Sequence, residues 1–170
     1  MQQRAWMLVV AVVGIGFVAA CDDDEPTAPS NITYTATLRG TTEVPTNTSA
    51  GTGLWTGVYN PTTKVVTYTM TFQGLSGTAS ASHIHAPATA TTNAGVIFNF
   101  QTPPTGHTGS LTLSGASGIA SGTINIANTI TATISGDSLI KLFDAGAAYV
   151  NVHSTPNFGG GEIRGMITRQ

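Results

Sequence analysis

The sequence predicts an all-β protein, an antiparallel Greek-key sandwich or barrel with one short helical segment near residues 138–145. Three observations predict this fold class. Apolar and polar residues alternate with a period of two over several stretches, as on strands that bury one face. Gly, Pro and Asn residues, which favour turns, separate these stretches. The chain also lacks the regular exchange of strand and long helix patterns that a parallel sheet needs.

The strand patterns follow one another along the chain. The clearest covers residues 66–73, where Val, Tyr, Met and Phe alternate with Thr and Gln, and an earlier one covers residues 33–39. Asn60-Pro61-Thr62-Thr63 and the Gly-containing run 73–77 are typical of turns. Further strands are expected near residues 51–59, 80–86, 95–101, 109–113, 118–126, 129–135, 147–153 and 161–168.

One segment departs from this alternation. Leu139, Ile140, Leu142 and Phe143 follow helical spacing. The preceding Asp137 and Ser138 are candidate caps, and Gly146 is a candidate stop. A short helix or helical turn is therefore expected at 138–145.

The first 20 residues have the pattern of a secretory signal. A basic start with Arg4 precedes an uncharged apolar stretch from Trp6 to Ala20, which is 15 residues long. A membrane-spanning helix needs roughly 18 or more apolar residues, so this stretch is too short to span. The run Val18-Ala19-Ala20-Cys21 matches the bacterial lipoprotein processing site.

Cys21 is therefore expected to carry a lipid that anchors the protein to the membrane. It is the only cysteine, so the chain forms no internal disulfide. The alternative is ordinary cleavage with an incidental cysteine. Residues 21–30 contain four acids and two prolines and are expected to be an extended tether. The expected location is extracytoplasmic, periplasmic or at the cell surface, because acids after a lipidated cysteine resemble both retention and surface-export signals.

The remaining residues 31–170 are long enough for one domain with a sizeable core. They carry five basic and four acidic residues among many Thr, Ser and Gly residues. This composition is common in extracellular β proteins. It also provides no basic field for nucleic acid, so a nucleic-acid partner is disfavoured.

Candidate functional residues come from three strand patterns. His83 and His85 are two residues apart and so share one face of a strand. In the second strand, Val150 and Val152 mark the core face. The outward residues of the second and third patterns are Tyr149, Asn151, His153, Glu162 and Arg164. If the three strands are neighbours, these side chains collect on one face.

Three interpretations of this cluster stay open. In the first it is a structural polar network, with Glu162 and Arg164 paired and the histidines bonded to backbone carbonyls. In the second, His83, His85 and His153 bind copper or zinc, with Glu162 or a water completing the shell. In the third, Arg164, Asn151 and Tyr149 form a patch that holds an anionic ligand without metal.

Several common catalytic signatures are missing from the sequence. It has no Gly-x-Ser-x-Gly elbow, no His-Glu-x-x-His and no phosphate-binding Gly-rich loop. No catalytic residue is assigned, and the sequence leans against an enzyme. His107, in a loop rich in Pro and Gly, is expected to face solvent.

The chain resembles the CHRD domain family, first described in the developmental protein chordin. The motifs that carry the resemblance are Leu38-Arg39-Gly40, Glu43-Val44-Pro45, residues 81–87 around His-Ile-His, residues 148–154 around Tyr-Val-Asn-Val-His, and residues 160–167 around Gly-Glu-Ile-Arg-Gly. Membership implies an extracellular β domain whose chemistry is poorly defined. The chain departs from the family pattern at Ala86-Pro87-Ala88, where a Gly commonly follows the histidines.

A fainter resemblance is to copper/zinc superoxide dismutase. It would make the three histidines metal ligands and Arg164 a guide for anions, although the cysteines and the full ligand set are missing. The leading interpretation is a lipid-anchored binding module of the bacterial cell envelope, with or without a metal, whose partner is an unknown protein or small molecule. The alternatives are a small copper/zinc redox metalloprotein and a purely structural surface protein.

Overall fold

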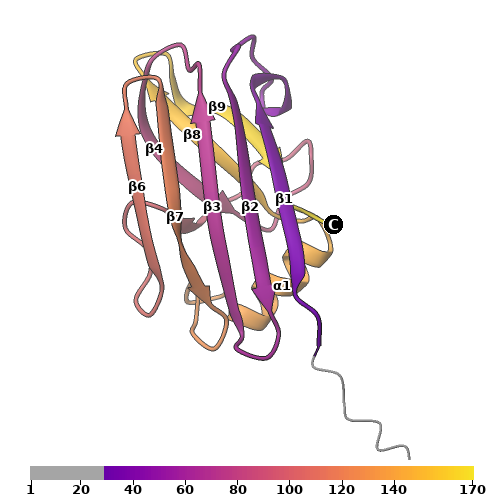
Figure 1. The fold of residues 1–170 in the computed structure, drawn as a ribbon. Helices are drawn as coiled ribbons and strands as arrows, with labels where there is room; N and C mark the ends of the chain where they lie inside the picture. Colours follow the sequence, from indigo (N-terminus) through magenta and orange to yellow (C-terminus); the bar gives the residue numbers. More distant parts are fainter. Residues whose placement is uncertain (1–28) are drawn as a thin grey trace, which may run out of the picture.

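The fold is an all-β sandwich made from one continuous antiparallel sheet that bends into two layers. The computed structural model describes residues 29–170. The strands hydrogen-bond in the order β5-β4-β8-β9-β1-β2-β3-β7-β6, and β10 pairs with β1. Figure 1 shows β6, β7, β3, β2 and β1 in the front layer and the yellow and magenta strands of the rear layer crossing behind them. The all-β prediction is confirmed.

The strands have the following bounds. The front layer contains β1 (Ile32–Arg39), β2 (Thr52–Asn60), β3 (Val65–Gln73), β6 (Thr108–Ser114) and β7 (Ser117–Asn125). The rear layer contains β4 (Thr78–His85), β5 (Val96–Asn99), β8 (Tyr149–Thr155) and β9 (Phe158–Met166), and the short β10 (Thr168–Arg169) follows. A 3-10 turn, η1 (Gly40–Thr42), follows β1.

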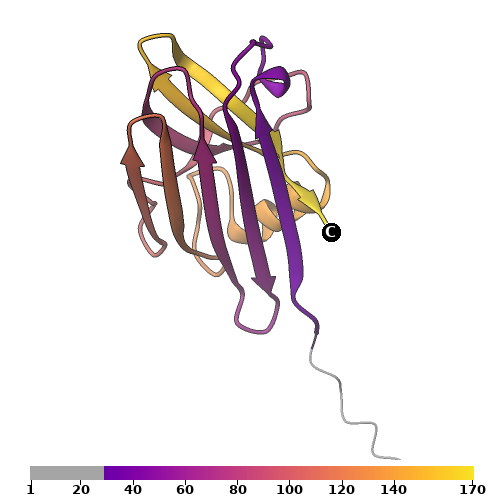
Figure 2. The same cartoon turned by 45° about the horizontal axis from the view of Figure 1, so that its top comes forward.

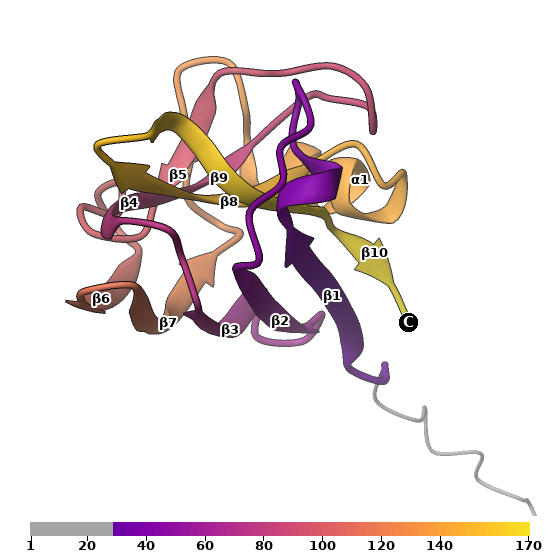
Figure 3. The ribbon, with the colours of Figure 1, turned by 90° about the horizontal axis from the view of Figure 1, so that it is seen from above.

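The bend in the sheet lies between β9 and β1. These two strands share one register pair, Arg39 with Arg164. Neighbours such as β3 and β7, or β4 and β8, are far apart in sequence, because the chain crosses between the layers as in Greek-key folds. The view from above in Figure 3 shows the rear layer lying across the front layer, with α1 at one side.

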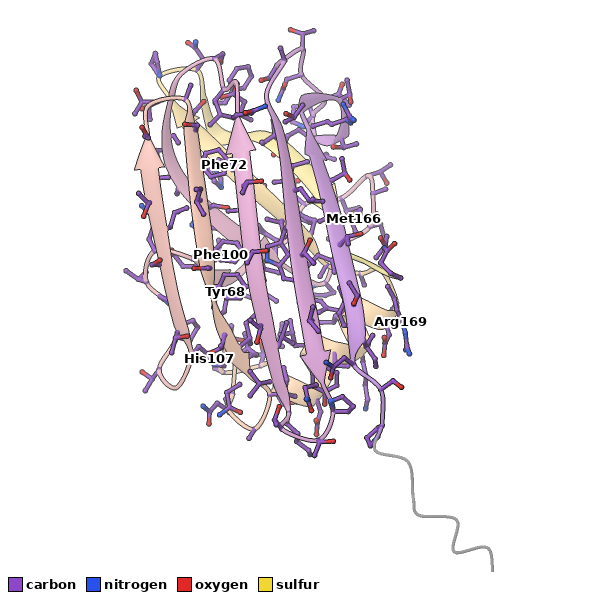
Figure 4. All side chains as sticks on the ribbon, viewed as in Figure 1. Tyr68, Phe72, Phe100, His107, Met166 and Arg169 are labelled. Carbon is purple, nitrogen blue, oxygen red and sulfur yellow. The ribbon has the colours of Figure 1, made fainter. Side chains whose placement is uncertain are left out.

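The period-two alternation has the expected effect in the front layer. In β3, Val66, Tyr68, Met70 and Phe72 are buried. Figure 4 shows Tyr68 and Phe72, with Phe100, directed into the space between the layers. The opposite face carries hydroxyl groups, and one row across the layer joins Thr35, Thr56, Thr69, Ser121 and Ser110. Hydroxyl groups, rather than charged side chains, make this face polar.

The helix α1 (Gly136–Asp144) closes one end of the core, as Figure 2 shows. Leu139 and Phe143 are fully buried, and Phe143 packs edge-on against Trp55 at 5.9 Å. The helix begins about two residues before the predicted 138–145, because Ser135 caps it by accepting a hydrogen bond from the Ser138 amide. The stop at Gly146, with φ +61°, is as predicted.

The strand predicted at 129–135 is wrong. This segment forms one isolated bridge, between Thr129 and Ser135, around a tight turn. The Thr131 hydroxyl accepts a hydrogen bond from the Ile134 amide. Ile130 and Ile134 both reach the core, but Ala132 between them is exposed, whereas a strand would bury all three on one face.

The N-terminal predictions lie outside the described residues. These are the signal at 1–20, the lipid on Cys21 and most of the tether at 21–30. Within residues 29–170, no helix combines the length and the apolar character that crossing a membrane requires.

Candidate metal centre

The pairing of β4 with β8 brings the three histidines together. In this register His83 lies opposite Asn151 and His85 lies opposite Tyr149, while His153 lies opposite Ala81, two residues further along β8. The residues between them on both strands point into the core and are fully buried. The histidines therefore occupy the outer face of the rear layer, away from the core.

His83 and His153 are in direct contact. The Nδ1 atom of His83 lies 3.0 Å from the Nε2 atom of His153. On its other side, His153 Nδ1 lies 2.9 Å from the Gly159 carbonyl oxygen and donates to it. That bond leaves the lone pair of His153 on Nε2, directed toward His83. A backbone carbonyl that fixes the tautomer of an imidazole is the usual outer partner of a metal ligand.

His85 has an acceptor beside each of its nitrogens. Nδ1 lies 2.9 Å from the Ala94 carbonyl oxygen, and Nε2 lies 3.1 Å from the Asn151 side-chain oxygen. A neutral imidazole has one N–H, so it donates to one of these oxygens. A half turn of the Asn151 amide places its nitrogen against Nε2 and satisfies both contacts with a neutral ring.

The three rings are held neutral at pH 7. Burial, and then the neighbouring His153 and His85, lower the pKa of His83 from 6.5 to about 4. Burial also lowers the pKa of His85 and of His153, against opposing backbone hydrogen bonds. Neutral imidazoles offer lone pairs, which metal binding requires.

The three ligand atoms suit a single transition metal. One nitrogen from each histidine lies within 4.8 Å of the others. Bonds of about 2.0–2.1 Å allow two ligand nitrogens to be at most about 4.2 Å apart. The His83–His153 pair meets this limit already, and the widest pair must close by at most about 0.6 Å. Nitrogen ligands of this kind suit zinc and copper.

The Tyr149 ring lies between His85 and Arg164 and contacts both. The Arg164 guanidinium lies 3.5 Å from the centre of the Tyr149 ring. The His85 ring stacks on the same tyrosine at 4.6 Å, with 6° between the planes. Because both groups stack on one ring, they take opposite faces of it, and the orientation of His85 depends on both neighbours.

Arg164 binds the protein's own loop. Its NH2 atom donates to the Thr89 and Thr92 carbonyls at 2.7 and 2.9 Å, and NH1 donates to Asn93 at 2.9 Å. Arg164, Asn151 and Tyr149 are each at most 3% exposed. These bonds hold the segment 86–95 against Arg164 and His85. The three side chains are buried, so they do not form a solvent-facing anion patch.

Glu162 lies apart from the histidines. Its Oε1 atom accepts from the Ser49 hydroxyl at 2.5 Å and from the Ser76 amide at 2.6 Å, and its Oε2 atom accepts from the Ser154 hydroxyl. In the described part of the chain, the group of potential metal ligands is the histidine trio alone. The pairing of Glu162 with Arg164 does not form either, since the ion pair found within residues 29–170 joins Arg169 to Asp144.

Sequence reasoning overlooked Glu43 as a site residue. This carboxyl group is 5% exposed and accepts from the Val44 amide, while its Oε1 atom lies unbonded near Asn151 and Gly161. Burial raises its pKa above 4.5, against lowering by Val44, Arg164 and Asn151. The signal available in the sequence was the scarcity of Glu in the domain.

His107 does not face solvent as expected. It is partly buried, its Nδ1 atom accepts from the Asn125 amide at 3.1 Å, and its ring packs edge-on against Phe98. Figure 4 shows it at the lower end of the front layer, in the loop that leads into β6. Because His107 lies outside the group of His83, His85 and His153, its substitution is a control for substitutions in that group.

Comparison with known proteins gives one family. A family model described as CHRD domain matches residues 34–167, which include every strand of the site. No curated protein and no solved structure matches the chain.

Proposed function

Because the chain belongs to the CHRD domain family, we propose that it is an extracytoplasmic CHRD module, anchored to the bacterial cell envelope by lipid on Cys21, which holds one copper or zinc ion. The observation that carries the metal part is the convergence of His83, His85 and His153. Two of the three rings have a backbone carbonyl on one nitrogen. Carbonyl partners of this kind pre-orient imidazoles for a metal.

The ion would be held by His153 through Nε2, by His83 through Nδ1 and by His85 through Nε2, which would give up its contact with Asn151. The Ala94 and Gly159 carbonyls would keep the rings in place. When bound, copper or zinc supplies a Lewis acid with room for an external ligand. A module of this kind would present the metal to a protein or small molecule outside the cell.

Metal analysis of the purified protein tests the site. We expect about one copper or zinc ion per chain, and at least a hundredfold weaker binding in His83→Ala and in His153→Ala, since each loses a ligand. The matched control is His107→Ala, which should keep the metal. Added metal should raise the melting temperature of the wild type, because a ligand of the folded state stabilises it.

Two results would contradict the metal proposal. One is less than about a tenth of an ion per chain without a thermal shift on adding copper or zinc. The other is equal binding by His83→Ala and the wild type. Either result would leave the polar network as the role of the trio and would favour a structural surface protein.

Labelling with radioactive palmitate tests the anchor separately. The wild type is expected to take up the label in a bacterial host, and Cys21→Ser is expected to take up none, because the lipid is attached to the thiol of Cys21. Equal labelling of the two, or no labelling of the wild type, would remove the lipid anchor and leave the metal proposal untouched.

A further inference from the structure

An apolar trough lies beside the segment whose Ala94 carbonyl contacts His85. It has a volume of about 690 Å³ and runs between β5, the turn at 131–134 and α1. Val96, Ile97, Ile134 and Leu142 form much of its wall. Val96 is 49% exposed, so the trough leaves a large hydrophobic side chain open to water. Small-molecule sites usually have volumes of this order and walls of this kind.

One charge lies on the rim of the trough. Lys141, in α1, lines it together with the hydroxyls of Thr131, Thr133 and Ser138. No acid lines the trough, and within residues 29–170 no carboxylate lies within 4 Å of the Lys141 ammonium. Asp137, one turn earlier, lies outside the trough, and Asp144 binds Arg169. An ammonium beside an apolar wall is complementary to a ligand with an apolar body and one negative charge.

We propose that this trough binds a single-chain aliphatic carboxylate. The chain lies along Val96, Ile97 and Leu142, and the carboxylate meets Lys141 and the neighbouring hydroxyls. A neutral alcohol would leave the ammonium unused, and a cationic amphiphile would be repelled by it. The proposal does not depend on the metal, because none of the three histidines lines the trough.

Titration with decanoate, monitored by calorimetry below its micelle concentration, tests the proposal. The full chain is used with Cys21→Ser, so that no attached acyl chain competes. We expect saturable binding that weakens at least tenfold in Lys141→Met, which keeps the apolar stem and removes the charge. The matched control is Lys64→Met, in the turn between β2 and β3, which should bind decanoate like the parent chain.

Chain length and head group give a second measurement. Each methylene removed between decanoate and octanoate should weaken binding by up to about fourfold, because each buried methylene contributes a fixed transfer free energy. Val96→Asp places a charge in the exposed wall and should abolish binding without loss of folding, which circular dichroism checks.

Three results of the binding measurements would overturn the proposal. They are unchanged decanoate binding in Lys141→Met, equal binding of decyltrimethylammonium, and no saturable binding at millimolar decanoate. The proposal would also be overturned if the chain self-associates and Val96→Asp abolishes this self-association. That result would identify the trough as a contact between two copies of the chain.

Discussion

Replacing Glu162 with alanine is expected to lower the free energy of unfolding by about 4 kcal/mol. The carboxylate is fully buried and accepts hydrogen bonds from Ser49, Ser76 and Ser154, so it joins the segment before β2, the turn after β3 and β8. Alanine removes the charged acceptor of all three donors, of which Ser154 is buried, and a hydrogen bond to a charged group contributes about 1.5–3 kcal/mol. Urea unfolding measures the change.

Glu162→Gln is the matched variant, because it keeps the shape and one acceptor oxygen. It should lose about half as much stability as alanine. Burial alone would raise the pKa of Glu162, but hydrogen bonds from Ser154, Ser49 and Ser76 outweigh it and lower the pKa below 4.5. A lowered folded-state pKa stabilises the protein above pH 4.5, and this stability is lost as the pH falls further.

The difference in stability between the wild type and Glu162→Gln should therefore narrow as the pH falls toward 3. A constant difference from pH 7 to pH 3 would contradict the assignment of this acid as an ionised hydrogen-bond acceptor. A loss below about 1 kcal/mol in Glu162→Ala would contradict its structural role.

Replacing Arg164 with alanine is expected to cost about 3 kcal/mol and to free the segment 86–95. The guanidinium donates to Thr89, Thr92 and Asn93, and charge-assisted bonds are worth more than neutral ones. It also covers one face of the Tyr149 ring. Unfolding experiments measure the stability, and hydrogen exchange of the amides at 88–95 measures the release of the segment.

Two control variants separate this effect from general loss of charge. Arg39→Ala removes the exposed arginine that pairs with residue 164 across the bend, and it should change stability by less than about 0.5 kcal/mol. Arg164→Lys should fall between wild type and alanine, since lysine cannot both stack and bond as a planar fork. Unchanged exchange at 88–95 in Arg164→Ala would show that the segment is held by other contacts.

The sequence predicted the strands because alternation is a local property. β3 shows it in full, since every apolar residue from Val66 to Phe72 is buried. Local patterns did not identify the helix cap, because several neighbouring residues are suitable for that position. Ser135, Asp137 and Ser138 are all good caps, and only the backbone geometry selects Ser135. Residues 129–135 have the alternation of a strand, with Ile130, Ala132 and Ile134 at every second position, but the segment folds back on itself in a turn.

The candidate site was predictable only in part, because it depends on contacts between distant segments. Parity showed that His83 and His85 share a face, but the register of β4 with β8 decides that His153 joins them. Parity also placed Glu162 beside Arg164. In the structure the two side chains bind different groups. Glu162 accepts hydrogen bonds from serines of three segments, while Arg164 donates to carbonyl oxygens of one loop. Nothing local marks Glu43 as buried.

The segment from Ala86 to Ile97 contacts both candidate binding regions. Its Ala94 carbonyl holds His85, its Thr89 and Thr92 carbonyls hold Arg164, and Val96 and Ile97 line the trough. A ligand that shifts this segment on one side therefore changes the free energy of binding on the other. The two effects are equal by thermodynamic reciprocity. The ratio by which an occupant of the trough would change the affinity for the metal equals the ratio by which the metal would change the affinity for that occupant.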